Sequence, residues 1–281
     1  MIEEKQTGAS DRGVALALGS SFLGVYAHGG FLCGLNEAGI FPGHVAGSSA
    51  GALAGGFYAA GLRGASLEAE VLSAVLKRKY PDWLMPVRSA PQGLGILSGI
   101  MGGQRVVKHL KEVLPVSDIS ETPGVKLSIS VTDLRASEGV FLTEGPLAES
   151  MMASCAVPVL FSGQKVGGRV YHDGGVVHVV PIAPFLSDPE IHTIIAHKIV
   201  HTGAAEGKRL AIKDAFVNGH HMLNDALLDY RKQEAERNGK RVIVLETECD
   251  HPGLFQTKAA KRRYFDQGFR TAEGILKQLE Q

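Results

Sequence analysis

A serine stands between two glycines at the point where an apolar stretch gives way to a run of small residues. Residues 47–51 read Gly-Ser-Ser-Ala-Gly. In a Gly-x-Ser-x-Gly turn the flanking glycines, here Gly47 and Gly51, leave room for a strained corner between strand and helix, which exposes the hydroxyl of Ser49. The helix that follows adds backbone amides, beginning at Ala50, and the positive end of its dipole. The pattern predicts a nucleophilic serine, and a structural tight turn is the alternative.

A serine hydroxyl reacts when a base removes its proton, and two kinds of base are open here. Several histidines follow the serine and could complete a triad, among them His192, His197, His201, His220, His221 and His251. Triad hydrolases of the α/β class, however, place several strands before the elbow, whereas one predicted strand and its helix precede the elbow strand here. Asp173 ends a short predicted strand, and Gly174 and Gly175 behind it let another backbone come close. Asp173 is therefore the best-placed carboxylate if a carboxylate acts directly as the base, and the residues alone leave both kinds of base open.

Strands and helices are predicted to alternate along the chain. The predicted strands span residues 14–18, 44–46, 126–132, 169–172, 193–200 and 242–246. The predicted helices span residues 25–38, the stretch from the elbow to about 61, 67–115 with an irregular middle at 80–103, 147–154, 214–238 and 258–279. Short apolar runs bounded by turn residues indicate the strands, and helical spacing of apolar residues indicates the helices. The alternation predicts an α/β fold in three layers, with a mostly parallel central sheet and helices on both of its faces.

The chain resembles the patatin-like phospholipase family in four segments, which follow one another in the same order as in the family. The family combines a glycine-rich oxyanion loop after the first strand, a Gly-x-Ser-x-Gly elbow after the second, and a later Asp-Gly-Gly motif. The matching segments are residues 18–40, 46–53, 153–161 and 168–181. The resemblance implies a catalytic dyad of Ser49 and Asp173, with no catalytic histidine, no metal and no cofactor.

The oxyanion loop departs from the family's usual Gly-Gly-Gly-x-Arg-Gly. Residues 19–24 read Gly-Ser-Ser-Phe-Leu-Gly, so Ser20 and Ser21 replace glycines and Leu23 replaces the arginine. The backbone amides survive these changes, although a positive φ at either serine would cost about 1–2 kcal/mol. The lost guanidinium leaves weaker oxyanion stabilisation or a different acyl substrate open. The expected oxyanion and substrate-binding residues are Gly19, Ser20, Ser21, Gly24 and Ala50.

The resemblance implies a serine acyl hydrolase that cleaves carboxylic esters of lipids. The reaction would be of phospholipase A, lysophospholipase or esterase type, with an acyl-serine intermediate on Ser49. Two alternatives stay open, both compatible with the altered loop. One is a lipid- or acyl-binding regulator with weakened catalytic machinery, and the other is an acyltransferase that uses the same nucleophile.

Length, charge and cysteine content limit the other classes of function. The 281 residues contain no stretch that reads as a linker, which predicts a single domain over residues 13–281 behind a polar leader at 1–12. A formal net charge of zero without long runs of like charge argues against nucleic acid as a partner. Three scattered cysteines argue against a disulfide framework or a zinc site and favour a cytoplasmic protein. The oligomeric state stays open.

Other residues with chemical potential have simpler interpretations. We expect His28 to pack or hydrogen-bond inside its helix, and His172 to point away from Asp173 because successive strand residues face opposite sides. The pair His220 and His221 lacks a third metal ligand in the sequence. Residues 80–86 hold the lone tryptophan behind three basic residues and fit either a transient contact with a membrane surface or a loop that caps the core.

Overall fold

The computed structural model describes residues 11–73, 101–158, 160–202, 212–250 and 257–275. An eight-stranded sheet forms its centre, in the order β5-β6-β3-β2-β1-β7-β8, with β4 paired to β3 outside this path. Strands β3, β2, β1, β7 and β8 run parallel to one another, whereas β4 and β6 run antiparallel to β3. The strands are β1 (Asp11–Leu18), β2 (Pro42–Ser48), β3 (Lys126–Asp133), β4 (Glu138–Leu142), β5 (Gln164–Val166), β6 (Arg169–Asp173), β7 (Thr193–Thr202) and β8 (Arg241–Asp250).

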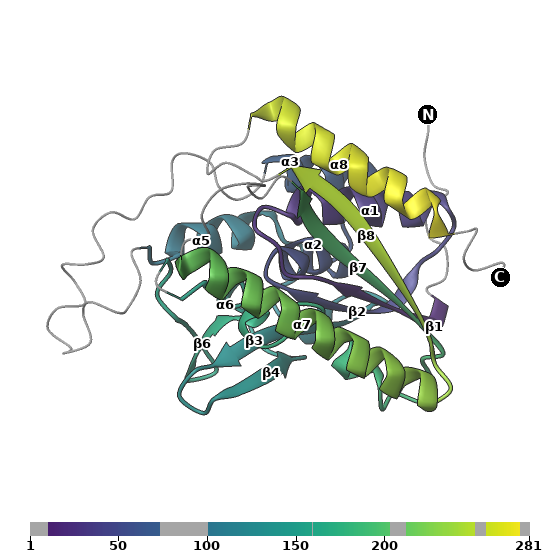
Figure 1. Cartoon of the computed structure of the whole chain (residues 1–281). Coiled ribbons are helices and arrows are strands. Elements are labelled where there is room, and N and C mark those ends of the chain that lie inside the picture. The colour runs from purple at the N-terminus through teal and green to yellow at the C-terminus, as the bar shows by residue number, and fades with distance from the viewer. Residues whose placement is uncertain (1–10, 74–100, 159, 203–211, 251–256, 276–281) are drawn as a thin grey trace, which may run out of the picture.

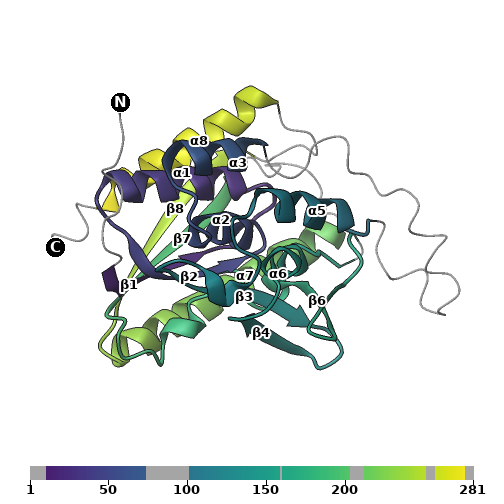
Figure 2. The same cartoon turned by 180° about the vertical axis from the view of Figure 1, so that it is seen from behind.

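Helices cover both faces of this sheet. Figures 1 and 2 show α7 on the opposite side of the sheet from α1 and α8. The helices are α1 (Val25–Glu37), α2 (Ala50–Ala59), α3 (Gly64–Ser73), α5 (Gln104–Val113), α6 (Leu147–Ser154), α7 (Ile212–Arg237) and α8 (Lys258–Glu273). The predicted three-layer α/β fold with a mostly parallel sheet is confirmed.

The alternation of side chains along β1 divides the core into two clusters. Leu16 and Leu18 face the larger cluster, which α1, α2 and α8 share. Ala15 and Ala17 face the smaller cluster, to which α7 contributes Leu228. Successive strand residues point to opposite faces, so one short sequence serves both layers. Strands from both ends of the described chain thus share this one sheet.

Most of the predicted elements lie within a few residues of the observed ones, and the differences have local reasons. The helix predicted at residues 147–154 coincides with α6, and the helix predicted at 25–38 is followed by Gly39 with a φ of +77°. Strands β4 and β5 were not predicted, because both are short and β4 is only partly buried. Of the predicted helical region 67–115, residues 74–100 lie outside the described residues, and with them the tryptophan segment at 80–86.

Helices α1 and α8 pack closely because glycines line their contact. A Cβ atom on Gly30 of α1 would overlap the carbonyl of Phe265, and a Cβ atom on Gly268 of α8 would overlap the carbonyl of Ala27. Each helix therefore presents bare backbone to the other. This contact fixes α1, whose first turn follows the loop at residues 19–24.

Substituting Gly268→Ala should destabilise the protein, because the added methyl group forces α8 away from α1. Overpacking of this kind costs about 1–3 kcal/mol, more than the intrinsic helix preference of alanine returns. Urea unfolding would measure the loss. The matched control is Gly219→Ala in α7, where a Cβ atom meets no other atom within 4 Å. A Gly268→Ala protein as stable as the Gly219→Ala protein would contradict this account of the helix contact.

Candidate active site

Ser49 occupies a strained corner between β2 and α2. Its φ of 52° and ψ of −116° lie in a region that residues with a side chain rarely adopt. The flanking glycines permit this corner: a Cβ atom on Gly47 would overlap the first turn of α2, and one on Gly51 would overlap the carbonyl of Leu18 in β1. The geometry is that expected for a nucleophile elbow.

Two strands that meet end to end on β3 bring Ser49 and Asp173 together. Strand β4 pairs with β3 from Ile129 to Asp133 and so occupies one of its edges. Strands β2 and β6 must therefore share the other edge. The last residue of β2, Ser48, pairs with Ser130, and Asp173 at the end of β6 pairs with Val131. The carboxyl ends of two strands thus face each other across neighbouring residues of β3.

The two side chains are in direct contact. Ser49 Oγ donates a hydrogen bond of 2.7 Å to Asp173 Oδ2, and Asp173 Oδ1 accepts one of 2.7 Å from the amide of Gly175. The aspartate is 4% exposed. Burial raises its pKa to about 6, although the hydrogen bonds from Ser49 and Gly175 lower it in part. At neutral pH the carboxylate is ionised and close to the pKa that suits a general base.

Ser154 holds the elbow in place and was not singled out by the sequence. Its hydroxyl accepts a 2.8 Å hydrogen bond from the amide of Ser49 and donates one of 2.6 Å to the carbonyl of Ser130. The side chain is fully buried at the end of α6. Ser154 thus ties the nucleophile to the edge of β3 where Asp173 also lies. The only sequence signal for Ser154 was that it lies in the segment 153–161, one of the four segments that resemble the family.

The oxyanion loop places its amides differently from the sequence-based expectation. The amide of Gly19 donates 3.0 Å to the carbonyl of His197, and that of Ser20 donates 2.6 Å to the carbonyl of Val179. Neither amide is therefore free to hold an oxyanion. The amide of Gly24 lies 3.4 Å from the carbonyl of Ser21, within the loop itself. The amides of Gly19, Ser20 and Gly24 thus have acceptors within the protein, while Ser20 still lines the cavity.

Two predicted donors remain, Ser21 and Ala50. Within the described part of the chain their amides have no acceptor, and both residues line the cavity that contains the dyad. The Ala50 amide belongs to the first turn of α2, where helix amides lack intrahelical partners. One of the two remaining donors thus comes from the loop at residues 19–24, and the other comes from the residue that directly follows Ser49.

Backbone strain in the loop falls on Leu23 and not on the two serines. Leu23 has a φ of +58°, whereas Ser20 and Ser21 have none of the positive φ values found in the described chain. The glycine-to-serine changes therefore carry no such penalty, and the cost of about 1–2 kcal/mol applies to Leu23. Its side chain is buried and lines the cavity where the family pattern has an arginine.

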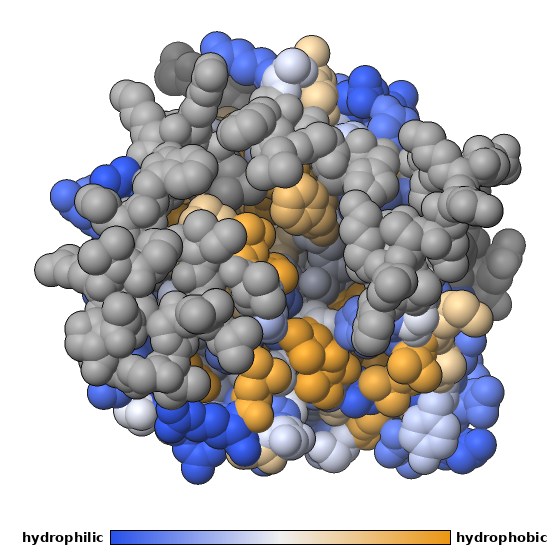
Figure 3. Space-filling model, turned by 60° about the vertical axis from the view of Figure 1, so that its left-hand side comes forward, coloured by the Kyte–Doolittle hydropathy of each residue, from blue (hydrophilic) through white to orange (hydrophobic). Residues whose placement is uncertain are grey.

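The dyad opens into an apolar cavity of about 610 Å³. The cavity lies where the parallel strands end, and Figure 3, turned to bring that side forward, shows apolar side chains gathered around a hollow. Its apolar walls include Val25, Leu53, Val106, Met152 and Phe161. The polar groups among the described lining residues gather around the dyad: Ser20, Ser21, Ser49, Asp173 and His220. This combination suits an acyl chain with an ester group at one end.

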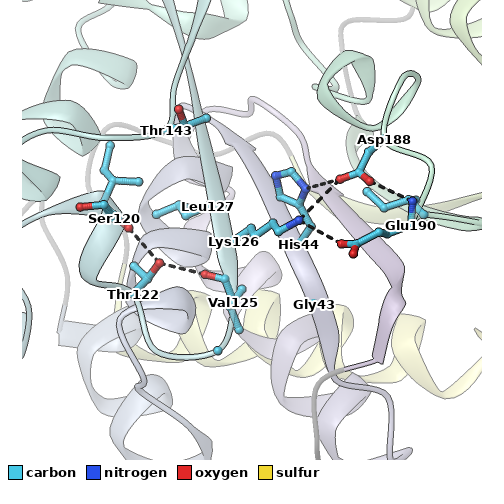
Figure 4. A pocket seen from close by; sticks show the side chains of 13 residues that line it. Gly43, His44, Ser120, Thr122, Val125, Lys126, Leu127, Thr143, Asp188 and Glu190 are labelled. Carbon is cyan, nitrogen blue, oxygen red and sulfur yellow. Dashed lines mark hydrogen bonds and ion pairs between the residues drawn. The ribbon is translucent and has the colours of Figure 1, made fainter.

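A second cavity, of about 590 Å³, lies at the opposite ends of β2 and β3. Figure 4 shows Lys126 pointing toward Asp188 and Glu190, with Nζ 3.9 Å and 3.1 Å from their carboxylate oxygens. His44 lies beside them, and its Nε2 is 2.9 Å from Ser128 Oγ. Lys126 offsets only one of the two negative charges, and the dyad is not part of this cavity.

The histidines do not complete a triad among the described side chains. Ser21 Oγ lies 2.9 Å from His201 Nε2, and His220 Nε2 lies 3.0 Å from the carbonyl of Gly175, but neither histidine is hydrogen-bonded to the dyad. His251 lies outside the described residues. His28 is fully buried and hydrogen-bonded, as expected. In the part of the chain that is described, no three potential ligands are grouped to hold a metal ion.

Comparisons with known proteins agree with this architecture. An uncharacterized NTE family protein of Mycobacterium bovis and two from Mycobacterium tuberculosis strains are each 33% identical over 177 residues, which is 63% of this chain and 46% of theirs. The chain thus spans about half the length of these curated relatives.

Solved structures show the same fold at low identity. VipD from Legionella pneumophila superposes with a TM-score of 0.53 at 16% identity, over 96% of this chain and 67% of VipD. The type III effector protein ExoU gives 0.52 at 15% identity, over 95% of this chain and 53% of ExoU.

The family is shown by a match to the whole motif region. The model of the patatin-like phospholipase family matches residues 16–186, more than half of the chain. This range contains the loop, the elbow and the Asp-Gly-Gly motif whose geometry is described above. The protein belongs to the patatin-like phospholipase family.

Proposed function

We propose that the protein is a serine acyl hydrolase that cleaves carboxylic esters of lipids. The observation that carries the proposal is the 2.7 Å hydrogen bond from Ser49 Oγ to Asp173 Oδ2 in an apolar cavity. A hydroxyl in a strained corner, bonded to a buried carboxylate, is equipped for nucleophilic attack. The membership of the family supports the same reaction class.

The mechanism uses the dyad twice. Asp173 Oδ2 takes the proton of Ser49 as Oγ attacks the ester carbonyl carbon, and the amides of Ser21 and Ala50 stabilise the resulting oxyanion. The tetrahedral intermediate collapses to an acyl-serine, and the leaving alcohol takes the proton from Asp173. A water molecule then gives a proton to Asp173 and attacks the acyl-serine carbonyl; as the new tetrahedral intermediate collapses, Asp173 returns this proton to Ser49 Oγ, which releases the carboxylic acid and restores the dyad.

The lining of the cavity favours a substrate that has an apolar acyl group and no negatively charged group near the reacting ester. None of the described lining residues is a lysine or an arginine, and Leu23 stands where the family pattern has an arginine. A charged head group would therefore remain outside the described cavity. We infer that long-chain acyl esters are better substrates than esters with an anionic group beside the carbonyl.

The two alternative functions differ from this proposal after substrate binding. The altered loop is the reason to consider a regulator with weakened catalytic machinery. However, Ser49 is hydrogen-bonded to Asp173, and neither Ser20 nor Ser21 has a positive φ. An acyltransferase would share the first half-reaction and pass the acyl group to an alcohol instead of water. Addition of an alcohol or a lysolipid followed by product analysis separates these two outcomes.

We further propose that the cavity mouth contacts a lipid surface during turnover. Phe22, Val157 and Val176 line the cavity and yet are 45%, 39% and 36% exposed. Met222 and Leu223, two and three residues after the lining residue His220 in α7, are both 72% exposed. Exposed apolar side chains around an apolar opening are typical of proteins that act at a lipid interface. No described helix has the length and apolar character needed to cross a membrane.

The dyad itself is tested by two substitutions. Ser49→Ala removes the nucleophile and Asp173→Asn removes the base, so each should lower hydrolysis of a p-nitrophenyl acyl ester by about 10³-fold or more. Labelling by a fluorophosphonate should be lost in Ser49→Ala. Ser48→Ala is the control, because that buried neighbouring hydroxyl has no hydrogen-bond partner among the described residues. Normal turnover in either dyad variant would rule the mechanism out, and acyl binding without labelling of the native protein would favour the regulator.

The pH dependence should follow Asp173. Since the pKa of its carboxyl is raised to about 6, kcat/KM should reach a plateau above this value and fall about tenfold per pH unit below it. Protonation of a group with a raised pKa favours the folded state, so this fall would not come from unfolding caused by Asp173. Circular dichroism at each pH checks that point. A profile that stays flat down to pH ~5 would contradict the role of Asp173 as base.

Contact with lipid can be separated from chemistry. The double substitution Met222→Ser with Leu223→Ser should reduce sedimentation with phosphatidylcholine vesicles by about tenfold, because less apolar surface becomes buried. Turnover of a short, soluble p-nitrophenyl ester should stay within about twofold. Tyr230→Ser is the control on the same helix, 60% exposed but about two turns further along. Unchanged vesicle binding in the double variant would remove Met222 and Leu223 from the lipid contact.

A further inference from the structure

A buried row of hydrogen bonds leads from the oxyanion loop along the face of the sheet that α1 and α8 cover, and ends on α8. The carbonyl of Gly19 lies 2.8 Å from His28 Nε2, and His28 Nδ1 lies 2.9 Å from His197 Nδ1. His197 Nε2 lies 2.8 Å from Thr247 Oγ1, which lies 2.7 Å from Thr271 Oγ1. Both histidines are fully buried. The row joins the loop to β7, β8 and α8.

Both imidazoles are neutral at physiological pH. Burial lowers the pKa of His28 to about 4 and the pKa of His197 well below its usual range. A neutral imidazole carries one N–H group, so one nitrogen donates and the other accepts. Each ring therefore has a fixed choice of tautomer once one of its partners is known.

The carbonyl of Gly19 determines every proton position that follows. A carbonyl oxygen only accepts, so His28 Nε2 carries the proton and His28 Nδ1 must accept. His197 Nδ1 then donates to His28, and His197 Nε2 accepts from the hydroxyl of Thr247. The single proton of Thr247 is then used for His197, so the 2.7 Å contact between Thr247 Oγ1 and Thr271 Oγ1 needs the proton of Thr271, whose hydroxyl also lies 3.1 Å from the carbonyl of Gln267. The donors all point in one direction, toward the loop.

This row completes a clamp on the residue that begins the oxyanion loop. The amide of Gly19 donates to the carbonyl of His197, its carbonyl accepts from His28, and the next amide, that of Ser20, donates to the carbonyl of Val179. The peptide groups on both sides of Gly19 are thereby prevented from rotating. The orientation of the following amide, that of Ser21, depends on them.

We propose that His28 and His197 are positioning residues, a neutral one-way hydrogen-bond relay that locks the Gly19–Ser20 peptide so that the Ser21 amide faces the oxyanion. The inference rests on the proposed function, because it assigns the two histidines to the same reaction. Neither imidazole lines the cavity, so neither touches the substrate.

The surroundings fit a relay better than simple filling of the core. The ring of Phe31 stacks on that of His197 with centroids 3.9 Å apart, and the two imidazoles meet edge to face at 4.7 Å. These contacts fix the ring planes. All four ring nitrogens have a partner, which a buried polar pair requires if it is not to weaken the fold. A leucine would fill the same space but could not hold the carbonyl of Gly19.

The test compares variants that keep or remove the donor to Gly19. His28→Leu should lower kcat for a soluble p-nitrophenyl ester by about 10- to 100-fold with KM nearly unchanged, since a misplaced amide weakens only the transition state. His28→Gln, whose side-chain amide can reach the same carbonyl, should recover most of kcat. His197→Leu should resemble His28→Leu. Phe265→Leu, a buried substitution in α8 outside the relay, is the control for lost stability.

Two kinetic results would overturn the proposal. The first is a His28→Leu protein with native kcat per folded molecule. The second is a His28→Gln protein no better than His28→Leu, since the donor would then not matter. If the native protein cleaves no ester, the proposed function fails, and nitrogen NMR of the histidines still tests the relay. It should find His28 protonated at Nε2 and His197 at Nδ1 between about pH 5 and 8, and the opposite tautomers would contradict the relay.

Discussion

The active arrangement depends on one contact, the hydroxyl of Ser49 against the buried carboxylate of Asp173. These residues lie 124 positions apart in the chain, and neither could find the other through local structure. Strand β3 brings them together, because β2 and β6 end on neighbouring residues of the same edge. The parallel sheet thus positions the two residues of this hydrogen bond. The helices that pack on the sheet stabilise the strand order in which β2 and β6 end on the same edge of β3.

Burial of the carboxylate has a cost that its partners offset only in part. An ionised group away from water is unfavourable unless hydrogen bonds replace its hydration. The amide of Gly175 and the hydroxyl of Ser49 supply two such bonds, and the pKa of Asp173 nevertheless stays raised. In the proposed mechanism this remaining imbalance suits the role of Asp173, because a carboxylate with a raised pKa is a stronger base. A more fully solvated aspartate would be more stable and less able to take the proton of Ser49.

The sequence predicted the fold class and the residues marked by glycine, because glycine reports a backbone constraint directly. Gly47 and Gly51 indicated the elbow, and Gly174 and Gly175 indicated the close approach beside the acid. Ser154 was missed, since a serine near the end of an apolar helix looks the same whether or not it bonds an elbow. The use of the Gly19 and Ser20 amides was also hidden, because their acceptors lie in β7 and the segment after β6.

The oxyanion loop illustrates a general exchange between sequence and tertiary structure. A loop rich in glycine can adopt many conformations, including ones with a positive φ. This loop instead has two serines and a leucine in place of three residues of the family motif. Its shape comes from outside: Gly19 and Ser20 together make three hydrogen bonds to α1, β7 and the segment after β6. A departure from a family motif is therefore no measure of lost function until the partners of the altered residues are known.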